Sequence, residues 1–187
     1  KKENKPKWLF FSSTSHVYKP LDKFKKISEK SKLDPASKYG KTKILAEKLI
    51  LKKLKKYPIK VCIGRIFSFT DKKQKEPFVI PTIKKKLKNS KKKIVFKNIN
   101  HFRDFLSTDD IISAIYILMK TSKFGIYNIG SGKKFDLRKI VKLFNKNNKD
   151  IVFRNTERPT YLISNNNKLL KTKWCPSKFK DNIKYFY

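Results

Sequence analysis

The fold is decided by WLFFSST at residues 8–14 and by YGKTK at residues 39–43. Four apolar residues that end in hydroxyl side chains indicate a short buried strand with a polar carboxyl end. The second stretch opens a helix predicted from about residue 37 to residue 56, and Pro58 ends it. Residues 59–67 form the next strand. A strand, a helix and a strand in this order predict a βαβ unit in a parallel sheet, and hence an α/β fold.

Apolar residues at helical spacing continue along the chain. In the first helix, Leu45 and Leu49 lie on an apolar face that either packs within the chain or pairs with a second copy. A later helix, capped by Thr108 or Asp109, is expected to bury Ile112 on its core face. Further helices are predicted near residues 78–87, 137–145 and 167–170, and further strands near residues 94–96, 126–129 and 151–153.

The charge of the chain is strongly basic. Its 187 residues, enough for one domain or two small ones, include 49 Lys+Arg against 14 Asp+Glu, a formal net charge of +35. Only five of the basic residues are arginine, the side chain that reads bases and binds phosphate in bidentate form. The lysines are spread along the whole chain, so we expect no specific nucleic-acid partner. Such a field still attracts anionic ligands, including a nucleotide sugar.

Signals for membranes, metals and disulfides are sparse. No run approaches 18 apolar residues, so no transmembrane helix is expected. Cys62 and Cys175 make neither a disulfide framework nor a metal cluster, and a reducing cytoplasm is the expected location. The sequence begins with Lys1 rather than Met, which suggests that part of the protein precedes it.

Tyr39 and Lys43 are four residues apart, so they lie on one face of the predicted helix. An ammonium group beside a phenol favours the phenolate, which suits a phenol that exchanges a proton. The hydroxyl groups at the end of the first strand can bond the same substrate oxygen. Together these groups suit proton transfer at a carbonyl or an alcohol while hydride moves to or from a nicotinamide. A second pair, Tyr116 and Lys120, lacks the preceding hydroxyl cluster, and we expect Tyr116 in the core.

Several segments, in order, resemble one known family. Residues 11–18 look like the strand-end motif of the extended short-chain dehydrogenase/reductases, the NAD-dependent epimerase/dehydratase family. The other segments are residues 37–43 with Glu47, residues 65–68, residues 101–110, residues 127–132 and residues 157–159. The resemblance runs from about Trp8 to Pro176. It implies the C-terminal portion of a Rossmann-type parallel sheet with a smaller α+β substrate-binding domain.

By this resemblance, Thr14, Tyr39 and Lys43 are the catalytic triad. Tyr39 would donate or accept the proton, Lys43 would hold the nicotinamide ribose, and Thr14 would steady the reacting oxygen. The implied cofactor is NAD or NADP, and the residues expected to contact it are Ser12, Ser13, Tyr39, Lys43, Phe67 and Ser68.

The substrate implied by the resemblance is a GDP-, UDP- or dTDP-linked sugar. Arg103 and Arg158 would bind its diphosphate, where a bidentate guanidinium is the suited group. Asn98 and Gln74 are weaker candidates for contacts near the sugar nucleotide. A surface role for Arg158 stays open.

Acidic residues near Arg103 leave two further questions. Arg103 has an alternative role in an ion pair with Asp104 or Asp109. Asp109 and Asp110 form a pair that we interpret as a helix cap rather than as an acid/base dyad. No metal site is expected.

The five glycines do not form the glycine-rich phosphate loop with which this family begins. We therefore expect a fragment that is inactive alone and pairs as a homodimer when complete. Residues 1–70 and about 107–130 would form a partial dinucleotide-binding domain. Residues 71–106 and 131–187 would form the nucleotide-sugar-binding domain.

Residues 74–81, 98–105, 158–159 and 165–169 resemble the GDP-4-keto-6-deoxymannose 4-reductases of cell-surface polysaccharide biosynthesis. This resemblance implies reduction at C4 of a 4-keto-6-deoxy sugar. A 4-epimerase is the alternative, since it would use the same residues. A dehydratase is less favoured because Ser15 and His16 stand where that reaction needs an acidic pair. A non-catalytic remnant is a further alternative. Thr160 and Tyr161 depart from the small residue and aspartate that are usual near the diphosphate.

Overall fold

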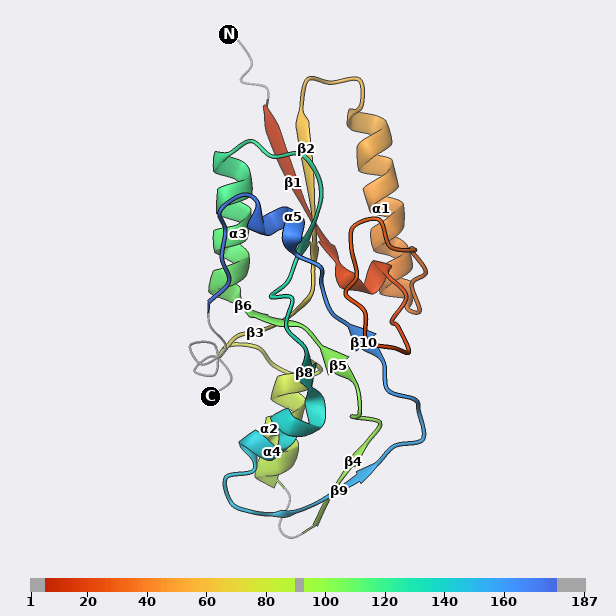
Figure 1. Cartoon of the computed structure of the whole chain (residues 1–187), viewed down its shortest axis with the longest axis vertical. Helices are drawn as coiled ribbons and strands as arrows, with labels where there is room; N and C mark the ends of the chain where they lie inside the picture. Colours follow the sequence, from red (N-terminus) through yellow and green to blue (C-terminus); the bar gives the residue numbers. More distant parts are fainter. Residues whose placement is uncertain (1–5, 90–92, 178–187) are drawn as a thin grey trace.

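A parallel sheet lies between two helices in one half of the molecule (Figure 1). The computed structural model describes residues 6–89 and 93–177. Strands β1 (Trp8–Thr14), β2 (Lys60–Ile66) and β7 (Gly125–Ile129) form this sheet in the order β1-β2-β7. Helices α1 (Lys38–Leu54) and α3 (Thr108–Lys120) cover its opposite faces. This arrangement confirms the predicted α/β fold with its parallel βαβ unit.

The second half of the molecule holds smaller elements (Figure 1). Helices α2 and α4 pack together there with a parallel pair formed by β4 and β9. Short strands connect the two halves: β3 pairs with β6, and β5 lies between β8 and β10. The bounds of these elements are α2 Val79–Asn89, β4 Lys93–Lys97, β9 Asp150–Arg154, α4 Leu137–Phe144, β3 Ser68–Thr70, β6 Phe105–Ser107, β5 Phe102–Arg103, β8 Phe135–Asp136, β10 Tyr161–Leu162 and α5 Asn167–Leu170.

Side-chain caps fix where the two large helices begin. The Ser37 hydroxyl accepts the backbone N–H of Gly40 and thereby caps α1. Gly40 also allows a close approach, because a Cβ at this position would lie 2.3 Å from the backbone oxygen of His16. The first turn of α1 is therefore held against the loop that follows β1. In α3 the cap is Ser107, in a capping box with Asp110, so the prediction of Thr108 or Asp109 as the cap was wrong.

The predicted core face of α3 was too wide, and of the two alternatives for the α1 face, packing within the chain does not hold for Leu45 and Leu49. Leu45 and Leu49 on α1 are exposed, and so are Ile112 and Tyr116 on α3. The expectation that Tyr116 lies in the core was therefore wrong. A sheet of three strands covers only a narrow stripe of each helix, so apolar residues beside that stripe stay in contact with solvent. Among the described residues, no helix has the length and apolar composition needed to cross a membrane.

Candidate functional site

A cavity of about 860 Å³ lies where the two halves meet. One wall is the carboxyl end of β1 with the start of α1, and the opposite wall comes from the smaller half. The lining side chains are those of residues 12–16, 66–69, 77–80 and 97–99, with Tyr39, Gln74, His101, Arg103, Phe105 and Leu137. Parallel sheets commonly take their ligands at the carboxyl ends of their strands, and this cavity has that position.

The first wall includes two of the three predicted catalytic residues, Tyr39 and Thr14, and the third, Lys43, lies next to Tyr39 on α1. Tyr39 projects from the first turn of α1 and is half-exposed at the cavity. One turn later, the Lys43 Nζ donates a hydrogen bond of 2.8 Å to the backbone oxygen of Ser12, and it lies 5.8 Å from the centre of the Tyr39 ring. Thr14 lines the cavity at the end of β1, where its hydroxyl accepts the backbone N–H of His16. Lys43 thus ties the helix that carries Tyr39 to the strand that carries Thr14.

A buried ion pair supports this wall from behind. Glu47, one turn beyond Lys43, accepts hydrogen bonds from Arg65 Nη2 at 2.7 Å and from Arg65 Nε at 3.1 Å. The same carboxylate accepts a hydrogen bond from the Ser13 hydroxyl. These contacts join α1, β1 and β2 directly beside Thr14. Sequence reasoning missed the pair, although the spacing of Tyr39, Lys43 and Glu47 places all three on one helix face.

The ion pair continues into a polar network. Arg65 Nη1 donates to the Tyr18 hydroxyl at 2.9 Å, and that hydroxyl donates to Asn128 Oδ1 at 2.7 Å. Burial raises the pKa of Tyr18 to about 12, although the hydrogen bond from Arg65 opposes the shift. Tyr18 is therefore a neutral phenol that both accepts and donates within the core, and it links β7 to the support of the site.

Arg103 stands on the opposite wall without an ion-pair partner among the described residues. Its Nη1 donates to the backbone oxygens of Phe102 at 2.8 Å and Thr160 at 3.0 Å. Asp104 points elsewhere and accepts hydrogen bonds from Ser131, Gly132 and Ser164. The alternative of an ion pair with Asp104 or Asp109 was therefore wrong. Burial lowers the pKa of Arg103 to about 10, the shift expected of a desolvated cation that no carboxylate offsets.

The other predicted contact residues are placed unequally. Ser12, Ser13, Phe67 and Ser68 line the cavity, as do Gln74 and Asn98. Gln74 Oε1 is buried and has no hydrogen-bond partner among the described residues, so it is free to accept a donor from a ligand. Asn98 is engaged in holding the loop at Thr156 and Glu157. Arg158 is exposed and does not line the cavity.

His16 lies at the same cavity, between the two walls. Its ring meets the Tyr39 ring edge-on, with 6.3 Å between the ring centres. Desolvation, with a contribution from the charge of Arg103, lowers the pKa of His16, so its imidazole is neutral at pH 7. His16 therefore faces the cavity as a neutral base.

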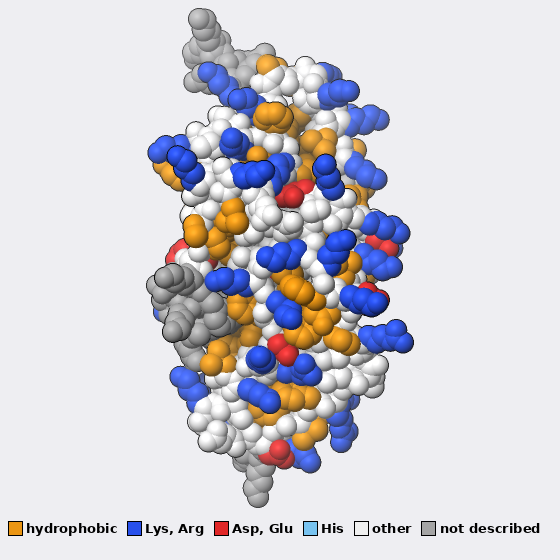
Figure 2. Space-filling view, in the orientation of Figure 1, with side chains coloured by type: hydrophobic (Ala, Val, Ile, Leu, Met, Phe, Trp, Pro, Cys, Tyr) orange, Lys and Arg blue, Asp and Glu red, His pale blue; other side chains and the backbone are white. Residues whose placement is uncertain are grey.

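Basic side chains cover the surface without gathering on one element (Figure 2). In this view, lysine and arginine side chains lie between apolar patches over the length of the face. On this face the distribution matches the even spread of lysine along the sequence.

The chain matches the sequence model of a family described as "GDP-mannose 4,6 dehydratase" over residues 1–181. It is 33% identical over 105 residues to a dTDP-D-glucose 4,6-dehydratase of Dictyostelium discoideum, a match that covers 56% of this chain and 24% of the relative. It is 30% identical over 144 residues to the uncharacterized UDP-glucose epimerase YtcB of Bacillus subtilis, a match that covers 76% of this chain and 45% of that protein.

Solved structures share the fold at low sequence identity. One is the UDP-glucuronic acid 4-epimerase of Bacillus cereus, in complex with UDP-glucuronic acid and NAD, with a TM-score of 0.85 and 23% identity. The match covers 100% of this chain and 62% of that chain. Another is RMD from Pseudomonas aeruginosa, complexed with NADPH, with a TM-score of 0.83 and 22% identity. That match covers 96% of this chain and 65% of the RMD chain. The chain thus spans less than half of the two curated relatives and under two thirds of these structures.

Proposed function

Because the chain belongs to the GDP-mannose 4,6-dehydratase family, we propose that it carries the catalytic and substrate-binding residues of an NAD(P)-dependent enzyme that acts on a nucleotide sugar. One observation carries the proposal. Thr14 and Tyr39 line one wall of a cavity, Lys43 lies beside Tyr39 on α1, and the opposite wall holds Arg103, which has no ion-pair partner among the described residues. An acid/base group thus lies across the cavity from a group that binds anions.

The residues present fit the nicotinamide end of the cofactor. Lys43 uses one N–H on Ser12 and keeps two donors for ribose hydroxyls, and the Tyr39 phenol is accessible beside it. Phe67 and Ser68 offer an apolar and a polar surface at the same strand ends. When bound, the nicotinamide supplies or accepts a hydride. No glycine-rich loop for the pyrophosphate is found in this sequence.

Arg103 and Gln74 are proposed to hold the substrate. The guanidinium is suited to the diphosphate, because it is desolvated and its nearest acceptors are carbonyl and hydroxyl oxygens. Gln74 Oε1 is a buried acceptor that a sugar hydroxyl can satisfy. A diphosphate contact for Arg158 stays a weaker proposal, since the loop that carries Arg158 would have to move toward the cavity when the ligand binds.

The proton transfer is proposed to run through Tyr39. Its phenol gives a proton to the C4 oxygen in reduction or takes one in oxidation, while Thr14 donates a hydrogen bond to the same oxygen. Lys43 Nζ lies 5.8 Å from the centre of the Tyr39 ring, so its positive charge is next to the phenol that exchanges the proton. His16 is a neutral imidazole, which supports reduction or epimerisation over dehydration.

We propose C4 reduction of a 4-keto-6-deoxy sugar nucleotide as the reaction, with 4-epimerisation as the second candidate. The match to YtcB over 76% of this chain favours the second. Reduction and epimerisation are distinguished by measuring how much NAD(P)H is consumed for each sugar converted. A reductase consumes one NAD(P)H for each sugar, whereas an epimerase interconverts two sugars and leaves the amount of reduced cofactor unchanged.

Replacing Tyr39 by Phe tests the proposal. In the complete protein, turnover of a GDP- or UDP-linked sugar should fall at least a hundredfold, the usual contribution of an acid/base group, while NAD(P)H binding measured by fluorescence is retained. Tyr116→Phe is the matched control, because that tyrosine has a lysine at the same spacing but lies on α3 away from the cavity. Its turnover should stay within about twofold of the original. Normal turnover of the Tyr39 variant would remove Tyr39 from the mechanism.

A further inference from the structure

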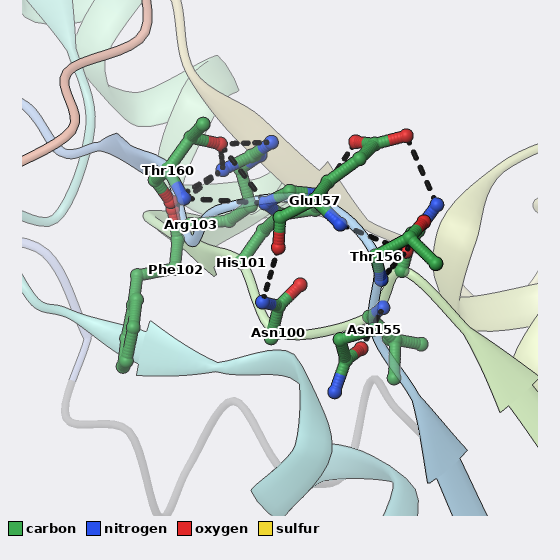
Figure 3. Close-up of polar contacts among 10 residues, drawn as sticks. Asn100, His101, Phe102, Arg103, Asn155, Thr156, Glu157 and Thr160 are labelled. Carbon is green, nitrogen blue, oxygen red and sulfur yellow. Dashed lines mark hydrogen bonds and ion pairs between the residues drawn. The ribbon is translucent and has the colours of Figure 1, made fainter.

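Thr160 holds the Arg103 guanidinium through its side chain (Figure 3). The Thr160 Oγ1 accepts hydrogen bonds from both Nη1 and Nη2 of Arg103, each at 3.2 Å. Because an arginine only donates, both contacts use lone pairs of the hydroxyl, and the hydroxyl proton must point elsewhere.

The Thr160 hydroxyl donates a hydrogen bond to His101, whose single Nδ1 lone pair is shared with a second donor. Its Nδ1 lies 3.1 Å from Thr160 Oγ1 and accepts the Thr160 backbone N–H at 3.2 Å. Since a backbone N–H donates to it, Nδ1 carries no proton, and the neutral imidazole has its hydrogen on Nε2, which lies 3.7 Å from a Glu157 carboxylate oxygen. Desolvation and the charge of Arg103 keep the pKa of His101 low, although Glu157 opposes the shift. His101 thus fixes the direction of the Thr160 hydroxyl.

The same loop is anchored on both sides of Thr160. Asn98 Oδ1 accepts the backbone N–H of Thr156, and Asn100 Nδ2 donates to the backbone oxygen of Glu157 (Figure 3). At Thr160 the backbone oxygen accepts the N–H of Phe102, and on the other side the backbone N–H of Tyr161 donates to the Leu21 oxygen. The hydroxyl is therefore presented to Arg103 from a rigid position.

The contacts leave part of the guanidinium free for a ligand. Of its five N–H groups, Nε–H and one hydrogen of Nη2 have no acceptor among the described residues. Arg103 lines the cavity, so these donors are available to an anion there.

We propose that Thr160 is a positioning residue, whose hydroxyl, oriented by His101, holds Arg103 so that its free N–H groups bind the diphosphate of a nucleoside diphosphate in bidentate form. This inference rests on the proposed function and names the residue that orients its anion-binding group. It does not require turnover, because the diphosphate site is measured by binding alone.

The experiment is a double-mutant cycle in which the binding of UDP and of GDP to the full chain is measured by calorimetry at pH 7.5. Thr160→Val removes the hydroxyl and keeps the shape, and it should weaken binding about tenfold. Thr160→Ser keeps the hydroxyl and should bind within about twofold of the original. In the Arg103→Ala background, Thr160→Val should have no further effect, because Thr160 acts through Arg103.

The outcomes separate the two proposals. If Arg103→Ala weakens binding but Thr160→Val does not, the inference fails and the proposed function stands. If Thr160→Val weakens binding equally with and without Arg103, the hydroxyl has a structural role and the positioning role is excluded. If the original chain binds neither nucleotide, or if Arg103→Ala binds like the original, the assigned diphosphate site fails, and the inference fails with it.

Discussion

Two arginines lie in the interior of this chain, and their surroundings differ. Arg65 is 2% exposed and forms a bidentate ion pair with Glu47. Burial alone would lower the pKa of Arg65, but the Glu47 carboxylate and the Tyr18 hydroxyl more than offset this and raise it. Within residues 6–89 and 93–177, Arg103 has only backbone oxygens and the Thr160 hydroxyl as acceptors, and its pKa falls to about 10.

The difference separates a structural cation from a binding cation. A buried charge is stable when its partners are present in the folded chain, as they are for Arg65. A cation that lines a cavity and has no carboxylate gains most when an anionic ligand arrives, as we propose for Arg103. Removing a partner of Arg65 should therefore cost stability, and removing Arg103 should cost binding.

The largest effect is expected for Glu47→Ala. It leaves the Arg65 guanidinium buried without its carboxylate and should lower the free energy of unfolding by about 3–5 kcal/mol, measured by urea denaturation. The double variant Glu47→Leu with Arg65→Met is the control. It removes both charges and fills their volume, so its loss should be much smaller. A loss of less than 1 kcal/mol for Glu47→Ala would show that water already solvates this pair.

A smaller and pH-dependent effect is expected for Tyr18→Phe. Removing the hydroxyl leaves Asn128 Oδ1 without its donor and Arg65 without one acceptor, which should cost about 1–3 kcal/mol at pH 8. The pKa of Tyr18 is raised from 10.0 to about 12, so the folded state keeps a proton that the unfolded state releases in this range. The stabilisation is complete below pH 10 and is lost as the pH rises toward 12.

The two proteins should therefore converge at high pH. By pH 11 the original chain should have lost about 1 kcal/mol from this phenol, and the Phe variant none, when both are compared by urea denaturation at each pH. The lysines titrate in both proteins, so their contribution cancels in the difference. Parallel pH curves would show that the Tyr18 phenol is not protected by the core.

The same contrast explains what the sequence could and could not predict. The hydroxyl cluster at the end of β1 and the Tyr39–Lys43 spacing predicted the first wall of the cavity, because local patterns determine where a strand ends and which residues share a helix face. The Glu47–Arg65 pair joins residues 18 positions apart and required the packing of α1 on β2, which no local pattern reports. The lack of a partner for Arg103 was equally invisible, since Asp104 and Asp109 are near it in sequence.

Apolar periodicity was a poorer guide on the outer helices. It predicted the existence of α1 and α3 but not which apolar residues are buried, because burial depends on how many strands lie beneath each helix. Leu45 and Leu49 are exposed on α1 in this chain. The homodimer expected for the complete protein stays a prediction, for which this exposed face is a candidate.

The smallest effect on stability is expected for Arg103→Met. The methionine keeps the apolar contacts of the side chain and removes a desolvated cation that has no carboxylate partner. Of the acceptors that lose a hydrogen bond, the Thr160 oxygen still accepts the N–H of Phe102, and the desolvation cost of the cation is removed, so the free energy of unfolding should change by less than about 1 kcal/mol. Binding of UDP or GDP to the same variant should nevertheless weaken by about 1.5–3 kcal/mol, the range for a hydrogen bond to a charged group. A loss of stability as large as that of Glu47→Ala would place Arg103 with Arg65, as a structural cation.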